Sequence, residues 1–175
     1  EQTLTKLGPG FRYPPQWAPD SKKIVWIDQA MKIWAYDFES MTNQLIDRQK
    51  WMYHGELQGF RASWSADSRW LAYAADLDTR NSAIVLYDFK NGTRQQVTSG
   101  FYNDEQPVFD PDGKYLYFRT GRSFNPVYSD LDNSWIYANT MQLAAVPLRK
   151  EVASPLAPRN DEETDKKKDE KKDER

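Results

Sequence analysis

Short apolar segments separated by polar turn residues make up most of residues 11–148 of this chain. Three of them, residues 24–27, 70–73 and 115–118, are apolar at every position. A strand with one solvated face alternates apolar and polar side chains, whereas a strand buried on both faces does not. Because the segments are short and bounded by Asp, Gly and Pro, we predict buried β-strands and no long helix.

A turn motif precedes each of these strands. Its three copies are Trp17-Ala18-Pro19-Asp20-Ser21, Trp64-Ser65-Ala66-Asp67-Ser68 and Phe109-Asp110-Pro111-Asp112-Gly113. The aspartates recur at intervals of 47 and 45 residues. A period in this range with strand-like content is typical of β-propeller blades. The sequence therefore predicts an all-β fold, namely a partial β-propeller of about three four-stranded antiparallel blades.

The repeat also predicts where the units begin and end. Residues 1–7 match the end of the second unit, because in both a strand-like run ends in Thr before a Gly-containing turn. We therefore expect residues 1–7 to be the outer strand of a preceding blade. The blades that follow are expected at 8–50 (blade 1), 51–100 (blade 2) and 101–158 (blade 3), with a loop insertion at 123–140.

The inner strands of the three blades are expected at residues 13–17, 60–64 and 106–110. In blade 2, Asn91-Gly92 between two strand-like runs predicts a hairpin turn. All residues from 161 to 175 except Thr164 are charged, so residues 159–175 are expected to form a charged linker tail.

The repeated residues have structural interpretations. We expect Asp20, Asp67 and Asp112 to bind backbone amides inside their turns rather than to act as acids or bases. The large aromatic residue before each turn is expected to lie in the core; the three residues are Trp17, Trp64 and Phe109. The loop aromatics Phe101, Tyr102, Phe124 and Tyr128 either pack between neighbouring blades or contact a bound peptide.

Charge and composition exclude several partners. Residues 1–160 contain 18 acidic and 18 basic residues, so this part of the chain is formally neutral. It lacks the positive field that captures phosphate backbones, and no apolar run approaches the ~20 residues that span a bilayer. We therefore expect no nucleic-acid partner and no membrane contact. The absence of cysteine excludes disulfides and thiolate sites.

No catalytic residue, cofactor or metal ion is expected. His54 is the only histidine, and residues 51–56 contain no nucleophile turn, so we interpret it as a loop residue. The segment Asp130-Leu131-Asp132 begins like a calcium-binding loop. However, Trp135 and Met141 occupy the sixth and twelfth positions, which excludes an EF-hand and leaves only another type of cation site open.

Two stretches carry a family resemblance. Residues 102–130, with the segment Asn125-Pro126-Val127-Tyr128, and the exit segment 148–158 resemble the propeller region of tricorn-type proteases. The blades of that family belong to the same repeat superfamily as the TolB propeller. The resemblance implies the last blades of a seven-bladed propeller that precedes a serine-peptidase core. No position of the chain matches the catalytic serine, histidine or glutamate of the family.

The resemblance implies a non-catalytic wall that channels or gates peptides towards the peptidase core. The implied partners are peptides or unfolded polypeptide, the remaining blades and protease domains, and further copies of the chain. Self-association is expected because the end blades of an open array expose apolar faces. Two alternatives remain: a TolB-like interaction propeller without a peptidase, and a propeller hydrolase, which requires clustered carboxylates or a nucleophile turn.

Overall fold

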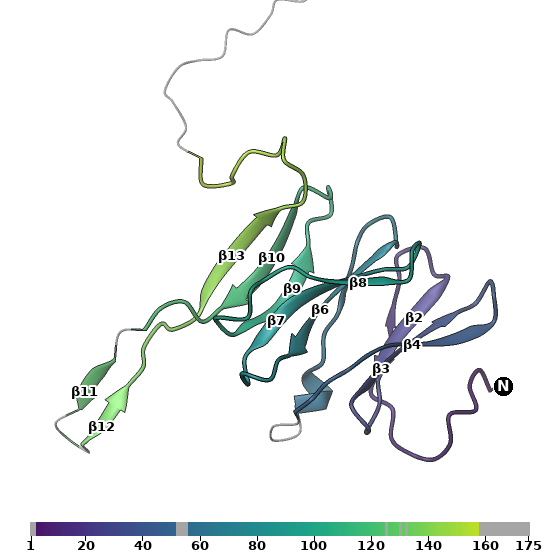
Figure 1. Ribbon diagram of the computed structural model, residues 1–175, viewed down its shortest axis with the longest axis horizontal. Coiled ribbons are helices and arrows are strands. Elements are labelled where there is room, and N and C mark those ends of the chain that lie inside the picture. Colours follow the sequence, from purple (N-terminus) through teal and green to yellow (C-terminus); the bar gives the residue numbers. More distant parts are fainter. Residues whose placement is uncertain (1–2, 52–55, 125, 130, 132, 158–175) are drawn as a thin grey trace, which may run out of the picture.

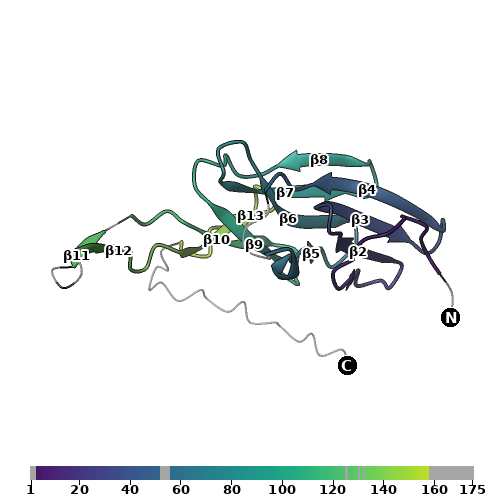
Figure 2. The ribbon, with the colours of Figure 1, turned by 90° about the horizontal axis from the view of Figure 1, so that it is seen from below.

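The computed structural model describes residues 3–51, 56–124, 126–129, 131 and 133–157. Three antiparallel sheets lie side by side, and a two-stranded hairpin projects away from the third sheet (Figures 1 and 2). The strands are connected in the up-and-down order that a propeller blade requires. The predicted all-β, partial-propeller fold is therefore confirmed.

Blades 1 and 2 each contain four strands in sequence order. The strands of blade 1 are β1 (Gln16–Trp17), β2 (Lys23–Ile27), β3 (Lys32–Asp37) and β4 (Thr42–Arg48). The strands of blade 2 are β5 (Ser63–Trp64), β6 (Trp70–Asp76), β7 (Ser82–Asp88) and β8 (Thr93–Gln96), and a short 3₁₀ helix, η1 (Glu56–Gly59), precedes them.

Blade 3 differs from the prediction of four strands. Its sheet has three strands in the order β13-β10-β9, with β9 (Asp104–Phe109), β10 (Tyr115–Thr120) and β13 (Gln142–Pro147). The predicted insertion contains a separate hairpin of β11 (Val127–Ser129) and β12 (Ser134–Ile136). Within the described part of the chain, no further strand pairs with the outer edge of β13.

A repeated hydrogen bond identifies β13 as the third strand of its blade. Leu148 N donates to Lys114 O at 2.9 Å, in the same way that Phe38 N donates to Lys22 O at 2.9 Å and Phe89 N to Arg69 O at 3.0 Å. In the complete blades, the carboxylates of Asp37 and Asp88 accept amides of the turn that leads to the fourth strand. Pro147 stands at this position in blade 3 and offers no carboxylate for such a turn.

The innermost strands are shorter than predicted in blades 1 and 2. β1 begins at Gln16, because Pro14 and Pro15 have no backbone N–H to donate to a ladder. Pairing resumes before the prolines, where Arg12 forms a bridge to Asp28 and Tyr13 N donates to Ile27 O at 3.0 Å. Residues 3–7 form no strand in this structure, so their place in a preceding blade stays a prediction.

Two apolar clusters join the blades. One contains Val25, Ile27 and Ile33 of blade 1 together with Leu71, Tyr73 and Val85 of blade 2. The other contains Ala72 and Ile84 of blade 2 together with Phe109, Leu116 and Phe118 of blade 3. Alternate residues of β6 thus face opposite neighbours, which explains why this strand is apolar at consecutive positions. Blade 2 therefore packs against a described blade on each face, whereas blades 1 and 3 each pack against one described blade.

Candidate functional site

The two ends of the sheets differ in their connections. The tight turns at residues 18–22, 65–69 and 110–114 lie at one end, which we call the turn end. Because neighbouring strands are antiparallel, the longer connections between blades emerge at the opposite end. We call this opposite end the loop end; its described connections are 28–31, 49–51, 56–62, 77–81 and 97–103.

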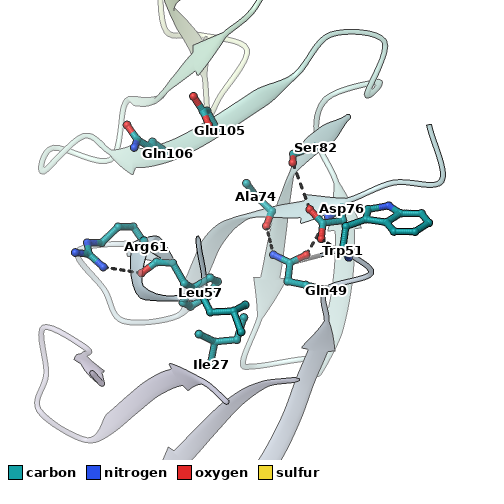
Figure 3. A pocket seen from close by; sticks show the side chains of 12 residues that line it. Ile27, Gln49, Trp51, Leu57, Arg61, Ala74, Asp76, Ser82, Glu105 and Gln106 are labelled. Carbon is teal, nitrogen blue, oxygen red and sulfur yellow. Dashed lines mark hydrogen bonds between the residues drawn. The ribbon is translucent and has the colours of Figure 1, made fainter. Parts of the chain in front are cut away.

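A cleft of about 310 Å³ opens at the loop end between the three blades. Its polar lining comes from Gln49, Trp51, Arg61, Asp76, Glu105 and Gln106, and Figure 3 shows how these side chains lie around it. Ile27 and Leu57 contribute apolar lining near Arg61. The cleft therefore combines apolar surface with charged groups of both signs.

The wall of the cleft is held by side chains that bind backbone. Gln49 Nε2 donates to Ala74 O at 2.6 Å, and its Oε1 accepts the Asp76 amide at 2.9 Å. The Asp76 carboxylate accepts the amide of Trp51 at 3.0 Å, and Trp51 Nε1 donates to Leu77 O at 2.9 Å. These contacts fix the connection between blades 1 and 2 against the edge of β6.

Across the cleft, Gln106 has a positive φ of 52° inside β9. The pairing of β9 with β10 shifts register between Tyr117 and Arg119, as expected for a bulge at a left-handed residue. Arg119 donates to Gln106 Oε1 at 3.1 Å and lies 3.7 Å from the Glu105 carboxylate. The bulge presents both side chains to the cleft.

The loop aromatics Phe101 and Tyr102 lie at the same end as the cleft. Asn81 Nδ2 donates to Gly100 O and Phe101 O, both at 3.0 Å, which ties their loop to the turn between β6 and β7. The Phe101 side chain is 76% exposed, and its ring packs edge-on against Tyr102 at 4.9 Å. These two residues are therefore not packed between the described blades.

Phe124 and Tyr128 belong to the insertion. Phe124 is 77% exposed and lies 5.9 Å from the Tyr137 ring, while Tyr128 packs edge-on against Trp135 at 5.5 Å. The two pairs keep aromatic surface open to solvent on a hairpin that extends beyond the sheets (Figure 1). The structure therefore divides the four candidate contact residues into a loop pair and a hairpin pair.

The turn aspartates do not all behave alike. Asp20 Oδ1 accepts the Lys22 amide at 2.9 Å, and Asp67 Oδ1 accepts the Arg69 amide at 3.2 Å. In blade 3 the corresponding amide, Lys114 N, donates instead to Asp110 Oδ2 at 3.0 Å. The side chain of Asp112 contacts the Lys114 ammonium at 3.2 Å, so the turn role expected for Asp112 is performed by Asp110.

The three repeated aromatics differ in burial. Phe109 is buried in the cluster between blades 2 and 3, and Trp64 packs against the cluster between blades 1 and 2. Trp17 is 57% exposed, although it stacks on Phe38 at 5.2 Å as Trp64 stacks on Phe89 at 5.0 Å. The prediction of a core position is therefore wrong for Trp17, because this slot faces the preceding blade and no described blade precedes blade 1.

Among the groups with displaced pKa values are Tyr73, which lies between blades 1 and 2, and Asp88, which lies within blade 2. Burial raises the pKa of Tyr73 above its ordinary value. The negative charge of Asp47, which accepts a 2.9 Å hydrogen bond from the Tyr73 hydroxyl, raises the pKa further. The Arg69 guanidinium, bound to both carboxylate oxygens of Asp88 at 2.9 and 2.7 Å, holds the pKa of Asp88 well below its usual range. Both groups lie away from the cleft.

His54, Asp130 and Asp132 lie outside the described residues. The described ranges contain no group of three His, Asp or Glu side chains that could hold a metal ion together. In the same ranges, no helix has the length and apolar character needed to cross a bilayer. Of the cleft carboxylates, Asp76 accepts the backbone amides of Lys50 and Trp51, and Glu105 lies 3.7 Å from Arg119.

Comparison with known proteins supplies the family. The family model of the tricorn protease second beta propeller domain matches residues 1–175. The chain belongs to this family. It is 30% identical over 157 residues to the tricorn protease of Thermoplasma volcanium, covering 86% of this chain and 15% of that protein. It is 29% identical over 109 residues to a tricorn protease homolog of Saccharolobus solfataricus, and the match covers 62% of this chain and 10% of that protein.

Solved structures agree on the fold of this tricorn propeller segment. A crystal structure of the tricorn protease superimposes with a TM-score of 0.73 at 23% identity, over 86% of this chain and 15% of that one. TolB from Acinetobacter baumannii gives a TM-score of 0.50 at 22% identity, over 73% of this chain and 32% of the TolB chain. The segment thus spans a small part of the tricorn proteins that it matches.

Several residues of the tricorn propeller cleft were missed by sequence reasoning. Gln49 and Gln106 belong to no motif, since their roles depend on a backbone edge and a bulge that are formed only in the folded sheets. Asp76 gave a weak signal as a carboxylate at the end of an apolar strand. These three residues give the cleft both uncharged and acidic hydrogen-bonding groups.

Proposed function

We propose that this chain forms part of a propeller wall that channels or gates peptides towards a serine-peptidase core. The observation that carries the proposal is the exposure of Phe101 and Tyr102 at the loop end, the end of the sheets at which the cleft also opens. Exposed aromatic rings with a hydrogen-bonding cleft nearby favour contact with a flexible, chemically varied chain.

Family membership supports a tricorn-type propeller. Tyr102 is further positioned by the Arg122 guanidinium, which lies 5.1 Å from its ring centroid. Trp51 is positioned in the same way by Arg80 at 5.0 Å. Aromatic rings that are already positioned by a neighbouring cation lose little conformational entropy when a peptide binds, which lowers the free-energy cost of the contact.

The test measures the binding of fluorescently labelled, extended peptides to the whole chain by fluorescence anisotropy. We expect the double substitution Phe101→Ala and Tyr102→Ala to weaken binding about tenfold, since each ring contact contributes about 0.5–1.5 kcal/mol. Met41→Ala is the matched control, because Met41 is 55% exposed but lies in the turn between β3 and β4 at the turn end. Equal binding by wild type and the double variant would contradict the proposal.

We also expect the chain by itself to leave fluorogenic peptides uncut, since its contribution is to bind and direct them. Cleavage by the purified chain that is lost on His54→Ala would instead favour the propeller hydrolase.

A further inference from the structure

Arg61 lines the cleft with one edge of its guanidinium free. It stands just before β5, and its Nη1 donates to Gln58 O at 3.1 Å and to Phe60 O at 2.9 Å. Within the described part of the chain, its Nε and Nη2 donate to no acceptor, and no Asp or Glu forms an ion pair with it. A planar guanidinium with two free donors matches a carboxylate, which accepts two parallel hydrogen bonds.

A comparison with Arg12 shows what is particular to Arg61. Arg12 precedes the inner strand of blade 1 as Arg61 precedes that of blade 2. Its Nη1 donates to Gly10 O at 2.6 Å and its Nη2 to Gly8 O at 2.7 Å, so both terminal nitrogens bind backbone. Arg61 is fixed by backbone through Nη1 alone. The backbone therefore positions its guanidinium and leaves the edge of Nε and Nη2 for a ligand.

Gln106 lies on the same side of the cleft as Arg61. Each of the two residues stands three positions before the repeated aromatic of its blade. Ser63 Oγ accepts the Phe109 amide at 2.9 Å and joins the inner strands of blades 2 and 3, which brings the two positions to the same level. Figure 3 shows Arg61 and Gln106 on one side of the cleft and Asp76 on the other.

The side-chain amide of Gln106 offers a donor at this place. Arg119 Nη1 donates to Gln106 Oε1 at 3.1 Å, which occupies the oxygen of the amide. The Gln106 Nε2 donates to no acceptor among the described residues. The positive φ of 52° and the bulge in β9 hold this side chain at the cleft. Arg61 and Gln106 together therefore present free donors and no free acceptor.

The acidic groups of the cleft already have partners. Glu105 lies 3.7 Å from the Arg119 guanidinium, and Asp76 accepts two backbone amides from the connection between blades 1 and 2. Arg61 is the charged group of the cleft that no described neighbour balances. A negative group of a ligand is therefore attracted to Arg61 and repelled from the opposite side, where Asp76 lies.

We propose that Arg61 and Gln106 bind a carboxylate of a peptide that lies in the cleft. Arg61 Nε and Nη2 donate to its two oxygens, and Gln106 Nε2 donates to one of them. The carboxylate belongs to an Asp or Glu side chain or to the carboxyl terminus of the peptide. The inference rests on the proposed contact with peptides. It uses only blades 2 and 3, which are neighbours within the described chain.

The test compares labelled extended peptides that share one sequence. One has Glu at its centre and an amidated carboxyl terminus, a second has Gln at its centre and the same amide, and a third has Gln and a free carboxyl terminus. In fluorescence anisotropy, we expect wild type to bind the Glu peptide about tenfold more tightly than the amidated Gln peptide. A preference for the third peptide instead supports the carboxylate site and identifies the terminus as its source. Equal binding of all three peptides overturns the proposal.

Arg61→Gln removes the charge and keeps a polar side chain. We expect this variant to bind the peptides with and without a carboxylate about equally. Arg12→Gln is the matched control, because it removes the same charge at the loop end of the neighbouring blade and should keep the preference of about tenfold. A preference that survives in Arg61→Gln overturns the proposal. Equal loss of the preference in both variants also overturns it, because this shows attraction by overall charge.

Gln106→Glu separates recognition from a structural role. The new carboxylate still accepts from Arg119, but it replaces the free amide donor with a negative charge. We expect the preference for a carboxylate to disappear while binding of the amidated Gln peptide stays as in wild type. A structural role alone would weaken the binding of all the peptides by the same factor, and this outcome would contradict the role given to Gln106.

The same measurements distinguish the failure of this site from the failure of the proposed function. The site alone fails when wild type shows no preference for a carboxylate, although Phe101→Ala with Tyr102→Ala still weakens the binding of the amidated Gln peptide. Both fail when wild type binds none of the peptides. Circular dichroism of each variant verifies that the chain is folded in every comparison.

Discussion

The hydroxyl of Tyr73 in blade 2 donates a 2.9 Å hydrogen bond to Oδ2 of Asp47 in blade 1. The same carboxylate oxygen accepts Arg94 Nε at 2.7 Å, so one acidic group of β4 holds both β6 and β8. Tyr73 is completely buried beneath this pair. This contact joins blades 1 and 2 through the neutral Tyr73 hydroxyl, and both burial and the charge of Asp47 oppose the ionisation of that hydroxyl.

Tyr73→Phe tests this link through the alkaline pH dependence of stability. The pKa of Tyr73 is raised above the value of 10.0 that it has when unfolded, so its contribution is fully present below pH 10 and is lost as the pH rises further. We expect the free energy of unfolding of wild type to fall above pH 10, and that of Tyr73→Phe to fall less. At neutral pH the variant loses about 1–2 kcal/mol in urea titrations.

Asp88→Asn tests the pH dependence of stability on the acid side. The pKa of Asp88 is lowered in the folded chain by Arg69, so its stabilising effect is present above the unfolded value of 3.8 and disappears as the pH falls below it. Wild type should therefore lose stability below about pH 4. Asp88→Asn should be less stable than wild type at neutral pH, and its stability should change less as the pH falls. Parallel pH profiles of the two proteins in thermal melts would contradict this role.

Trp64→Ala and Trp17→Ala compare one repeated slot in two surroundings. At a protein concentration where the chain is monomeric, Trp64→Ala should cost about 3 kcal/mol, since it removes an aromatic that packs on the core. Trp17→Ala should cost about 1 kcal/mol or less, because its ring is mostly exposed and loses only the stack on Phe38. Similar urea midpoints for the two variants would contradict the expectation that the more buried Trp64 contributes more to stability than Trp17.

Gly100→Ala tests a close approach between Gly100 and Leu77 at the loop end. Gly100 has φ +75°, and an added Cβ would lie 1.9 Å from Leu77 Cδ1. We expect a loss of about 2–4 kcal/mol from the left-handed conformation and the crowding together. Gly92→Ala is the control: φ is +64° there, but the nearest atom is 3.8 Å away, so only about 1 kcal/mol should be lost.

The repeating parts of the fold could be predicted because their causes are local. The turns at Ser21, Ser68 and Gly113 all have φ near +60°, at 60°, 58° and 64°, and each closes with an amide to a carbonyl three residues earlier. The residues that favour such turns are visible in the sequence. The consecutive apolar residues of the second strands predicted burial on both faces for the same reason.

The departures have causes that the sequence does not show locally. Trp17 occupies the same motif position as Trp64, and only the absence of a described neighbouring blade makes it exposed. Asp110 rather than Asp112 accepts the Lys114 amide, and a motif that contains both carboxylates does not show which of them will do so. The cleft could not be predicted at all, because its wall combines residues from all three blades that no motif connects.

Blade 2 has a neighbour on each side, and this unequal coverage determines how the chain comes apart. Among the described residues each blade packs against the next one along the chain, so these three blades approximate a one-dimensional array of coupled units. Either terminal unit can open while breaking a single interface, but the middle unit must break two. Amide hydrogens of β6 and β7 should therefore exchange last, and a core substitution in blade 2 should loosen both ends at once.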